Sequence, residues 1–487
     1  MYMSYYNYDE PLEYADEDYD TIPEQNEPIN SWTNICETCI LPSTMQIISY
    51  MGIIIGFSFI CHIGIVICYH LKTKKEWLLH IISISAGCGM LTVAVGTNSF
   101  IIIFFAIFSY LVFLLINLFP PFRKNIGVIM VICTILTLLC SEHIWKNQIA
   151  WEMIKGSAMV VNMKIISIAF EMQETVLKSQ RAKNVPNILS FCGYIFTPAN
   201  LIVGPWIPYS SYLYSIRLNP TKQFHMRRLM WVCFCCLLSL GFLNSSNCIV
   251  PYLFSNSSLV WVRIFRDAFA VRCSHYFVSF LSQASLITGG LLIHKDDKPN
   301  KWLGHMVTLP LHIEFPRSLS SAVRVWNVPM HKFLKEYIFR GIYKRFNSHL
   351  VAIFVTYLVS SLLHGQYLKI YLVLFSLAIF GFVESILRKK ISIAFNACVT
   401  AQACRKPCHF KHCSSHGWQS DGAILVKLTN LLFSMVTIFH LAYIGAMMNE
   451  SIAGEDTGFG VDLSLWSSVS YFNHWIVLLT YLLYLVI

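Results

Sequence analysis

The sequence predicts an all-α polytopic membrane protein, and three observations support this fold class. First, 55% of the 487 residues are hydrophobic and 13% are charged, whereas a soluble protein carries about 25% charged residues. Second, apolar runs long enough to span a bilayer as helices recur between short charged segments. Third, these runs continue to the last residue, so they are not a removable signal peptide. We expect a multi-helix bundle with about 9–11 spans plus re-entrant or interfacial helices.

The predicted elements follow one another in a simple order. Residues 1–40 are acidic, rich in tyrosine and dotted with proline, a composition that predicts a disordered tail. A single membrane domain, 41–487, follows this tail. Its predicted spans are 46–70, 78–96, 100–119, 126–143, 229–250, 265–292, 350–367, 368–387, 424–446 and 468–487.

Two further apolar segments are not simple spans. Segment 150–172 carries Glu152, Lys155 and Lys164, which predicts a helix buried among others or lying in the interface. Segment 187–213 is interrupted by glycines and prolines. Such breaks at membrane depth are tolerated where protein shields the backbone or the backbone lines a cavity. We therefore predict a re-entrant segment there.

Charge alternates from one side of the predicted membrane to the other. Residues 1–71 contain ten acidic and no basic residues, and the rest of the chain contains 36 basic against 16 acidic residues. The basic residues lie in short loops without an RNA- or DNA-reading motif, so they predict cytoplasmic loops and no nucleic-acid partner. This alternation places the N-terminus in the lumen, and the loop 388–420 and the C-terminus in the cytosol. The sequons at Asn244, Asn256 and Asn449 then lie on the lumenal side, where they could carry glycan.

Histidine inside an apolar span is the first chemical signal. His364 stands in the middle of "VTYLVSSLLHGQYLKIYLVLFSLAIFGF" (355–382), near the predicted lumenal end of its span. A charged group at membrane depth costs about 2.5–3.5 kcal/mol, so an ionisable residue there is a candidate for function. A neutral imidazole costs less and can also serve helix packing. His275 in "RCSHYFVSFLSQ" and His440 in "TIFHLAYIG" are equal candidates, and spacing does not choose among the three.

The amphipathic stretch 305–348 holds a second candidate, Asn327, which lies between Trp326 and Val328 at the predicted start of a helix. The other face of this helix is basic and carries Lys332, Lys335, Arg340, Lys344 and Arg345. Asn before a helix is an ordinary cap, and a basic face is ordinary at a cytoplasmic interface. The same face could instead hold the phosphates of a nucleotide-containing acyl donor. These residues leave both interpretations open.

Cysteine and histidine gather in "CVTAQACRKPCHFKHCSSH". The residues of ligand type there are Cys398, Cys404, Cys408, Cys413, His409, His412 and His416. They could supply a tetrahedral zinc site, but the spacing C-x5-C-x3-C-x4-C is not that of a standard finger. Acylated cysteines or free thiols are at least as compatible with it. We expect no catalytic metal here, because the loop lies a span's length from His364.

Other motifs say less. Near the N-terminus, "CETC" (Cys36 and Cys39) predicts a disulfide or two idle thiols. The sequence contains no P-loop, dinucleotide fingerprint, HExxH motif or GxSxG elbow. An enzyme with this sequence would therefore act on lipid or at a membrane surface with few polar groups.

An Asn in "WNVPMHKFL", followed in the next apolar span by a lone His in "SSLLHG", resembles the signature of the membrane-bound O-acyltransferases. The likeness runs from about residue 40 to the C-terminus and leaves the acidic tail outside it. It includes "VGPWIPYSSYL", "SHYFVSFLSQAS", "EFPRSL", "VESILRKK", "ACVTAQAC" and "IFHLAYIG". The resemblance implies a helix bundle with a central acyl tunnel that joins the two faces. It also implies His364 and Asn327 as catalytic residues, with His275 and His440 in structural or pocket roles.

Within that family, the same motifs resemble those of the members that lipidate Wnt proteins. This resemblance implies transfer of palmitoleate from palmitoleoyl-CoA to a serine hydroxyl of Wnt in the endoplasmic reticulum membrane, without a further cofactor or metal. The expected substrate-binding residues are Trp326, Tyr357, Ser360, Arg317 and His275. Two alternatives remain: a family member with a lipid or another secreted peptide as acceptor, and a transporter. A transporter needs paired broken helices, and the chain offers one broken segment.

Overall fold

The computed structural model describes residues 32–71, 75–145, 149–179, 185–218, 226–254, 257–291, 306–404, 408–413, 422–448 and 463–487. Helices dominate these ranges, which also contain an isolated β-bridge between Ala397 and His412. The tail up to residue 31, the sequons at Asn256 and Asn449, and His416 lie outside the described residues. The all-α fold class is confirmed.

Each predicted span corresponds to a helix. These helices are α2 (Leu41–His70), α3 (Glu76–Val95), α4 (Ser99–Leu118), α6 (Ile126–Trp145), α10 (Met226–Asn244), α12 (Val260–Thr288), α17 (His349–Leu363), α18 (Leu368–Ala394), α19 (Ala423–Ala446) and α21 (Phe472–Val486). Within the described ranges, seven helical stretches are long and apolar enough to cross a membrane, and α17 and α21 are shorter apolar helices. The chain is a polytopic membrane protein.

Shorter and broken elements connect these helices. They are α1 (Trp32–Ile35), η1 (Cys36–Ile40), η2 (Gly96–Asn98), α5 (Pro120–Arg123), α7 (Ile149–Ser179), α8 (Ile188–Ile195), η3 (Pro198–Asn200), α9 (Tyr209–Arg217), η5 (Ser245–Ile249), α11 (Val250–Leu253), α13 (Pro310–Glu314), α14 (Leu319–Trp326), α15 (Val328–Phe333), η7 (Leu334–Phe339), α16 (Arg340–Phe346) and α20 (Ser464–Ser468). The predicted amphipathic stretch 305–348 is thus a chain of short helices from α13 to α16.

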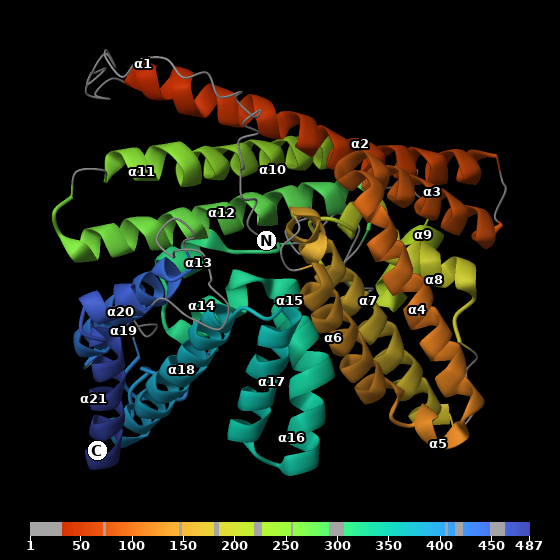
Figure 1. The fold of residues 1–487 in the computed structure, drawn as a ribbon. Coiled ribbons are helices and arrows are strands. Elements are labelled where there is room, and N and C mark those ends of the chain that lie inside the picture. Colours follow the sequence, from red (N-terminus) through yellow and green to blue (C-terminus); the bar gives the residue numbers. More distant parts are fainter. Residues whose placement is uncertain are drawn as a thin grey trace, which may run out of the picture.

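The helices form two groups joined by α12 and α17 (Figure 1). The largest apolar core lies in the N-terminal group and draws on α2, α3, α4, α6, α7 and α8. A smaller core lies among α18, α19 and α21. α12 packs against α10, α2 and α19, so it contacts both groups. α17 lies between α6 and α18 and contacts both, which places its C-terminal end where the two groups meet.

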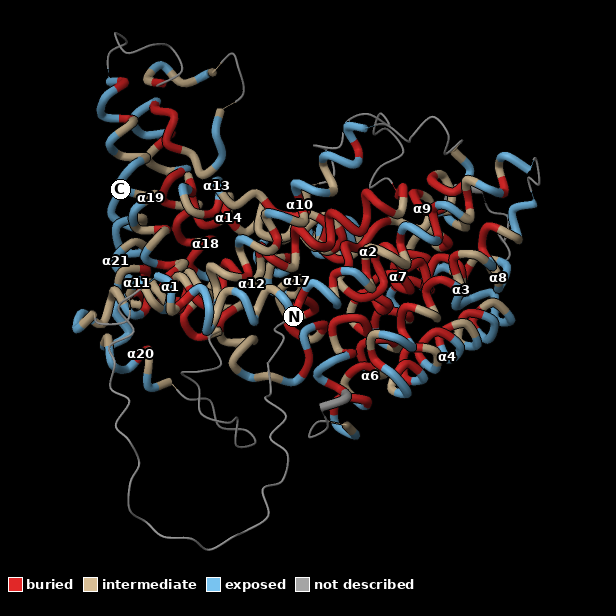
Figure 2. Tube along the Cα trace, turned by 90° about the horizontal axis from the view of Figure 1, so that it is seen from above, coloured by how far each residue is buried: buried red, intermediate tan, exposed pale blue. Residues whose placement is uncertain are grey.

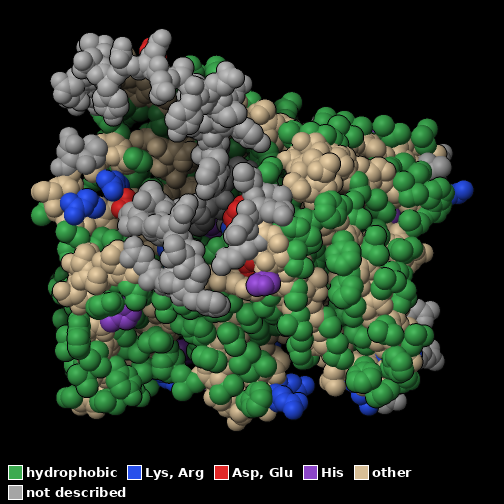
Figure 3. All heavy atoms as spheres, in the orientation of Figure 1, with side chains coloured by type: hydrophobic (Ala, Val, Ile, Leu, Met, Phe, Trp, Pro, Cys, Tyr) green, Lys and Arg blue, Asp and Glu red, His purple; other side chains and the backbone are tan. Residues whose placement is uncertain are grey.

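The outer surface of the bundle is apolar. Leu111, Leu115 and Leu118 on α4 are 57%, 56% and 73% exposed, and α19 presents leucines in the same way. Hydrophobic side chains cover most of the face in Figure 3, and most of its visible Lys and Arg lie near the edges. In Figure 2 the buried residues fill the interior around α2, α3 and α7, while the exposed ones follow the outer helices. A bilayer is the solvent that suits this surface.

The N-terminal helix begins earlier than predicted. α1 and η1 continue directly into α2, so residues 32–40, assigned to the disordered tail from the sequence, are helical. Cys39 forms a disulfide with Cys248, and Cys36 is free, so the "CETC" pair is not bonded to itself. In the same contact, the amide of Asn244 donates to Thr44 Oγ1 at 2.9 Å. Asn244 is therefore engaged in helix packing in this structure.

The helix α7 is buried along most of its length, as predicted for segment 150–172. Its fully buried Lys164 donates to the carbonyls of Tyr194 and Ile195, at 3.1 and 3.0 Å. These are the last carbonyls of α8, which no helical N–H can satisfy and where a cation is favourable. Lys164 is therefore a buried cap for a neighbouring helix.

The predicted re-entrant segment is confirmed as a broken and mostly buried stretch, α8–η3–α9. At its second end, the Glu171 carboxylate accepts from the Ser210 N–H at 3.1 Å, beside the first turn of α9. Trp206 packs its ring against Phe333 and Tyr337, at centroid distances of 5.3 and 5.7 Å. Protein thus shields the broken backbone, as it must at membrane depth, and the segment supports the short helices α15 and η7.

Candidate active site

His364 lies at the end of α17, in the sharp turn that leads to α18. Its backbone N–H donates to Ser361 O at 3.0 Å, and the helix stops because Gly365 follows with φ = 100°. Few residues other than glycine adopt that backbone conformation without strain. Tyr357 and Ser360 precede His364 by two turns and one turn, so the three side chains share one face of the helix.

A carboxylate holds this turn in place. Glu142, buried near the end of α6, accepts from the Gln366 N–H at 2.6 Å, while the Gln366 amide donates to Leu139 O at 3.0 Å. A Cβ added at Gly365 would lie 2.5 Å from Glu142 Oε1, so the glycine also makes room for the carboxylate. The sequence pattern does not single out Glu142, since its only signal is that of an acid in the last apolar turns of a predicted span.

Two other titratable side chains lie near the His364 ring. The residue is exposed, and the His275 imidazole and the Lys155 ammonium are within electrostatic range of its ring. Within the described part of the chain, its ring nitrogens make no hydrogen bond. Lys155 is itself ion-paired with Glu152, whose carboxylate accepts from the Tyr367 hydroxyl at 2.6 Å. The ring nitrogens are thus available to a substrate.

His275, on α12, links this space to the segment that carries Asn327. Its ring stacks on Trp326, with centroids 4.3 Å apart and planes 9° apart, and its Nε2 lies 2.8 Å from Trp326 O. Nε2 must be the donor in that bond, because a carbonyl can only accept. The protein therefore places His275 against Trp326 and within electrostatic range of His364, and gives His275 a positioning contact with the backbone next to Asn327.

Asn327 is the N-cap of α15. The capping hydrogen bond uses the oxygen of its side-chain amide and leaves the NH2 end to point elsewhere. Its Oδ1 accepts from the Met330 N–H at 3.0 Å. Because this bond requires the oxygen, the amide orientation follows from the network. The NH2 end has no hydrogen-bond partner within the described residues. Asn327 is therefore both an ordinary cap and a donor aimed away from the helix, so its two interpretations are compatible.

The segment after Asn327 is basic, as predicted. Lys335, Lys344 and Arg345 are exposed, whereas Arg340 is paired with Glu336 one turn away. Burial, together with the charges of Arg324 and Lys335, lowers the pKa of His331 to about 4. The neutral His331 adds no charge at pH 7, and the lysines and arginines supply the positive face that could meet phosphates.

Two predicted residues lie elsewhere. The guanidinium of Arg317 donates to Thr400 O and Cys398 O, both at 3.0 Å. It is committed to the Cys/His loop, so its assignment as a substrate-binding residue is not supported. His440, on α19, packs its ring 4.8 Å from that of Phe380, which fits the structural role expected of it. Cys398, Cys404, Cys408 and Cys413 come together at the far end of α18.

The fold and this site define the class of the protein. The model of the MBOAT, membrane-bound O-acyltransferase family, matches residues 125–406, which include both His364 and Asn327. The chain belongs to this family and is an O-acyltransferase, so the transporter alternative is wrong.

Three related proteins show which members of the family the chain is similar to. It is 34% identical to the protein-serine O-palmitoleoyltransferase porcupine of Drosophila melanogaster over 93% of this chain and 86% of that protein. It is 28% identical to the human protein of the same name over 91% of this chain and 95% of that protein. A lysophospholipid acyltransferase of Schizosaccharomyces pombe is 25% identical over 65% of this chain and 68% of that protein.

Proposed function

We propose that this protein transfers palmitoleate from palmitoleoyl-CoA to a serine hydroxyl of a Wnt protein. The observation that carries the proposal is the exposed His364, whose ring nitrogens are unused by the described protein, near the stacked pair His275–Trp326 and the cap Asn327. The names of the relatives at 28% and 34% identity supply the serine acceptor and the palmitoleoyl donor.

In the proposed reaction, a ring nitrogen of His364 takes the proton of the acceptor serine as Oγ attacks the thioester carbonyl. Histidine suits this role because its unperturbed pKa lies near neutrality. The new C–O bond gives a tetrahedral oxyanion, to which the Asn327 NH2 would donate. Collapse of this intermediate breaks the C–S bond, and the imidazolium returns its proton to the leaving CoA thiolate. Serine has then gained an acyl ester, and no acyl-enzyme is required.

The proposed compartments follow from the charge pattern. With the N-terminus in the lumen of the endoplasmic reticulum and the C-terminus in the cytosol, the acyl-CoA reaches the basic segment from the cytosol and the secreted acceptor reaches His364 from the lumen. Cys36 is a free, exposed cysteine on the proposed lumenal side. A membrane-impermeant maleimide should label it in sealed microsomes only after detergent is added. Labelling of Cys36 in sealed vesicles would contradict this orientation.

The test of function is an acceptor assay on the purified chain. We expect mass spectrometry to show palmitoleate on a Wnt peptide at its serine, and none on the matched peptide in which alanine replaces that serine. The donor panel contains palmitoleoyl-CoA, its saturated analogue palmitoyl-CoA and a shorter acyl-CoA. An absence of peptide acylation by protein that holds palmitoleoyl-CoA would contradict the proposal.

The fission yeast relative supports a second candidate, acylation of a lysophospholipid. The same His364 and Asn327 would serve it, because a glycerol hydroxyl is chemically similar to a serine hydroxyl. The assay therefore includes a lysophospholipid as acceptor at equal concentration. Transfer to the lipid with none to the peptide would replace the first proposal with this one.

A further inference from the structure

Four cysteines that the acyl-transfer mechanism does not use meet in the loop between α18 and α19. The sulfur atoms of Cys398, Cys404, Cys408 and Cys413 all lie within 4.8 Å of one another. The sulfurs of Cys404 and Cys413 are 3.4 Å apart. A tetrahedral zinc site with four cysteine ligands, and with Zn–S bonds of about 2.3 Å, requires sulfurs about 3.8 Å apart. The cluster therefore has nearly the dimensions of a zinc site.

The backbone around the cluster is built to bring these cysteines together. Asn396, in the left-handed conformation with φ = 47°, turns the chain immediately after α18. Its carbonyl accepts from the His412 N–H at 3.0 Å, and the Cys398 N–H donates to His412 O at 2.8 Å. These bonds pair the segment that carries Cys398 with the segment that carries Cys413. Backbone pairing brings the four cysteines together, so their spacing in the sequence need not follow that of a short zinc-finger motif.

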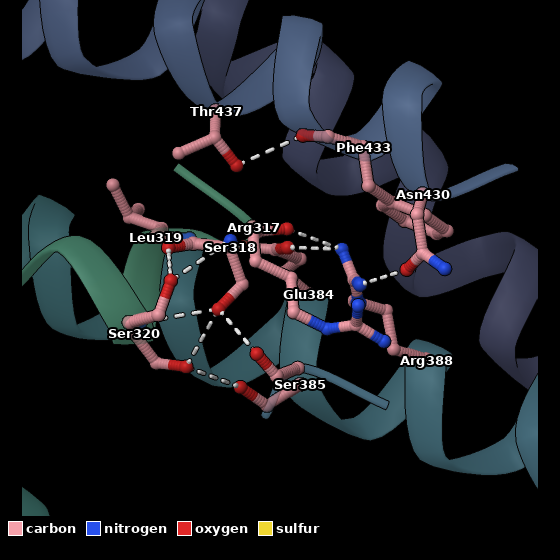
Figure 4. Close-up of polar contacts among 12 residues, drawn as sticks. Arg317, Ser318, Leu319, Ser320, Glu384, Ser385, Arg388, Asn430, Phe433 and Thr437 are labelled. Carbon is pink, nitrogen blue, oxygen red and sulfur yellow. Dashed lines mark hydrogen bonds and ion pairs between the residues drawn. The ribbon is translucent and has the colours of Figure 1, made fainter. Parts of the chain in front are cut away.

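Polar side chains from neighbouring elements hold the same loop, and Figure 4 shows two of them, Arg388 and Asn430, in contact. Arg388, on α18, donates to Val399 O at 2.8 Å and to Asn430 Oδ1 at 2.7 Å, and Asn430 in turn donates to Cys398 O at 3.2 Å. Arg317 adds its bonds to the carbonyls of Cys398 and Thr400. Its guanidinium also lies 3.9 Å from the Cys398 sulfur.

A bound zinc ion would take all four cysteines as thiolates. Binding of Zn²⁺ by four thiols releases four protons to solvent and leaves a complex with a net charge of about −2. The Arg317 guanidinium beside Cys398 offsets part of this charge. Cys398 and Cys413 are 3% and 1% exposed, so they are poorly placed to receive an acyl chain.

We propose that Cys398, Cys404, Cys408 and Cys413 bind one structural zinc ion. The ion cross-links the loop that follows α18 and, through Arg317, stabilises the chain that enters α14. That helix ends at Trp326, next to Asn327, so the metal contributes to the rigidity of the active-site segment. It has no part in the chemistry. Arg388, which holds the loop, lies 20 residues along α18 from Leu368, about 30 Å of helix from the His364 turn.

The first test measures metal in the full chain, purified in detergent without added metal. Elemental analysis should find about one equivalent of zinc per chain, as a site with four cysteine ligands requires. The variant Cys404→Ser/Cys408→Ser, which removes the two less buried ligands, should lose at least half of this zinc. The control Cys36→Ser/Cys233→Ser, which removes two exposed free cysteines outside the cluster, should keep it. Zinc-free wild-type protein, or equal zinc in both variants, would overturn the proposal.

A second test does not depend on whether the variants fold. Protein stripped by a strong chelator and reloaded with Co²⁺ should show thiolate-to-cobalt charge transfer and the intense visible bands of a tetrahedral site. Stripping should lower Tm, and Zn²⁺ should restore it where Mg²⁺ does not. Intact mass that shows disulfides or acyl groups on the four cysteines of untreated protein would overturn the assignment. His364→Ala should retain full zinc, so failure of the proposed acyl transfer remains distinguishable from failure of this site.

Discussion

The two ends of α18 carry polar clusters of opposite character. Near its C-terminal end, Arg388 donates to carbonyls of the Cys/His loop, to Asn430 and to Glu384, and the Glu384 carboxylate also accepts from the Leu319 N–H at 2.8 Å. Near its N-terminal end, Glu142 holds the turn, while the ring nitrogens of His364 have no partner among the described residues. The ring nitrogens of His364 are therefore available to a substrate, whereas the groups bonded to Arg388 and Glu384 hold the structure together.

The largest effect on turnover is expected for His364→Ala, which tests whether the N-terminal end of α18 serves catalysis. Because general-base catalysis contributes about 10²–10⁴-fold, we expect turnover to fall by at least about 100-fold while Tm and acyl-CoA binding stay near wild type. The matched control is His440→Ala, a histidine packed against Phe380, which should lower Tm more than turnover. Turnover of His364→Ala within about threefold of wild type, far below the general-base range, would make His364 a packing residue.

The next largest effect is expected at Asn327, where two substitutions separate its two roles. Asn327→Ala removes both the cap and the donor, and Asn327→Asp keeps a cap oxygen but loses the NH2. Both should lower kcat, by about 10²–10³-fold if the amide supports the oxyanion. Only the Ala variant should also lose the roughly 1 kcal/mol of a helix cap. An Asp variant with wild-type kcat would show that the residue acts through the cap alone.

A smaller loss of turnover is expected when Glu142, which positions the turn after His364, is replaced. Glu142→Ala leaves the Gln366 N–H without its acceptor, and a displacement of about 1 Å in a catalytic group can cost up to about 100-fold. Glu142→Gln keeps an acceptor oxygen and should recover most of the turnover. The diagnostic readout is a fall in kcat with an unchanged KM for acyl-CoA. If Ala and Gln behave alike, the hydrogen bond to the turn does not position His364.

The spans could be predicted from the sequence because an apolar run long enough to cross a bilayer is recognisable without knowledge of tertiary contacts. The motifs shared with the family predicted catalytic roles for His364 and Asn327. The position of Asn327 before a predicted helix also predicted that it is a helix cap. The sequence could not predict the disulfide Cys39–Cys248, which joins residues 209 positions apart. Nor could it predict that Lys164 caps α8 or that Glu142 holds the turn after α17, because each acts on a distant element.

Arg317 shows that residues close together in the sequence can also lie in different parts of the structure. It lies in the motif "EFPRSL", ten residues before Asn327, and the family resemblance suggested a substrate-binding role for it. The eight-residue helix α14 lies between the two, however, and carries the chain away from the Cys/His loop toward the active site. Sequence neighbours thus come to lie in different clusters, one satisfied and one open to substrate.

The last and smallest expected effect on turnover is at Arg317 itself. Arg317→Ala leaves the carbonyls of Cys398 and Thr400 without their donor, so we expect a lower Tm and a lower zinc content. Kinetically, the KM for palmitoleoyl-CoA should stay within about twofold and kcat should fall little, because no reacting group loses a contact. Arg317→Lys, which keeps the charge but cannot bridge two carbonyls with one planar group, should fall between Ala and wild type in Tm. A rise of about tenfold or more in KM at unchanged Tm would return Arg317 to the substrate pocket, and the two ends of α18 would then belong to one site.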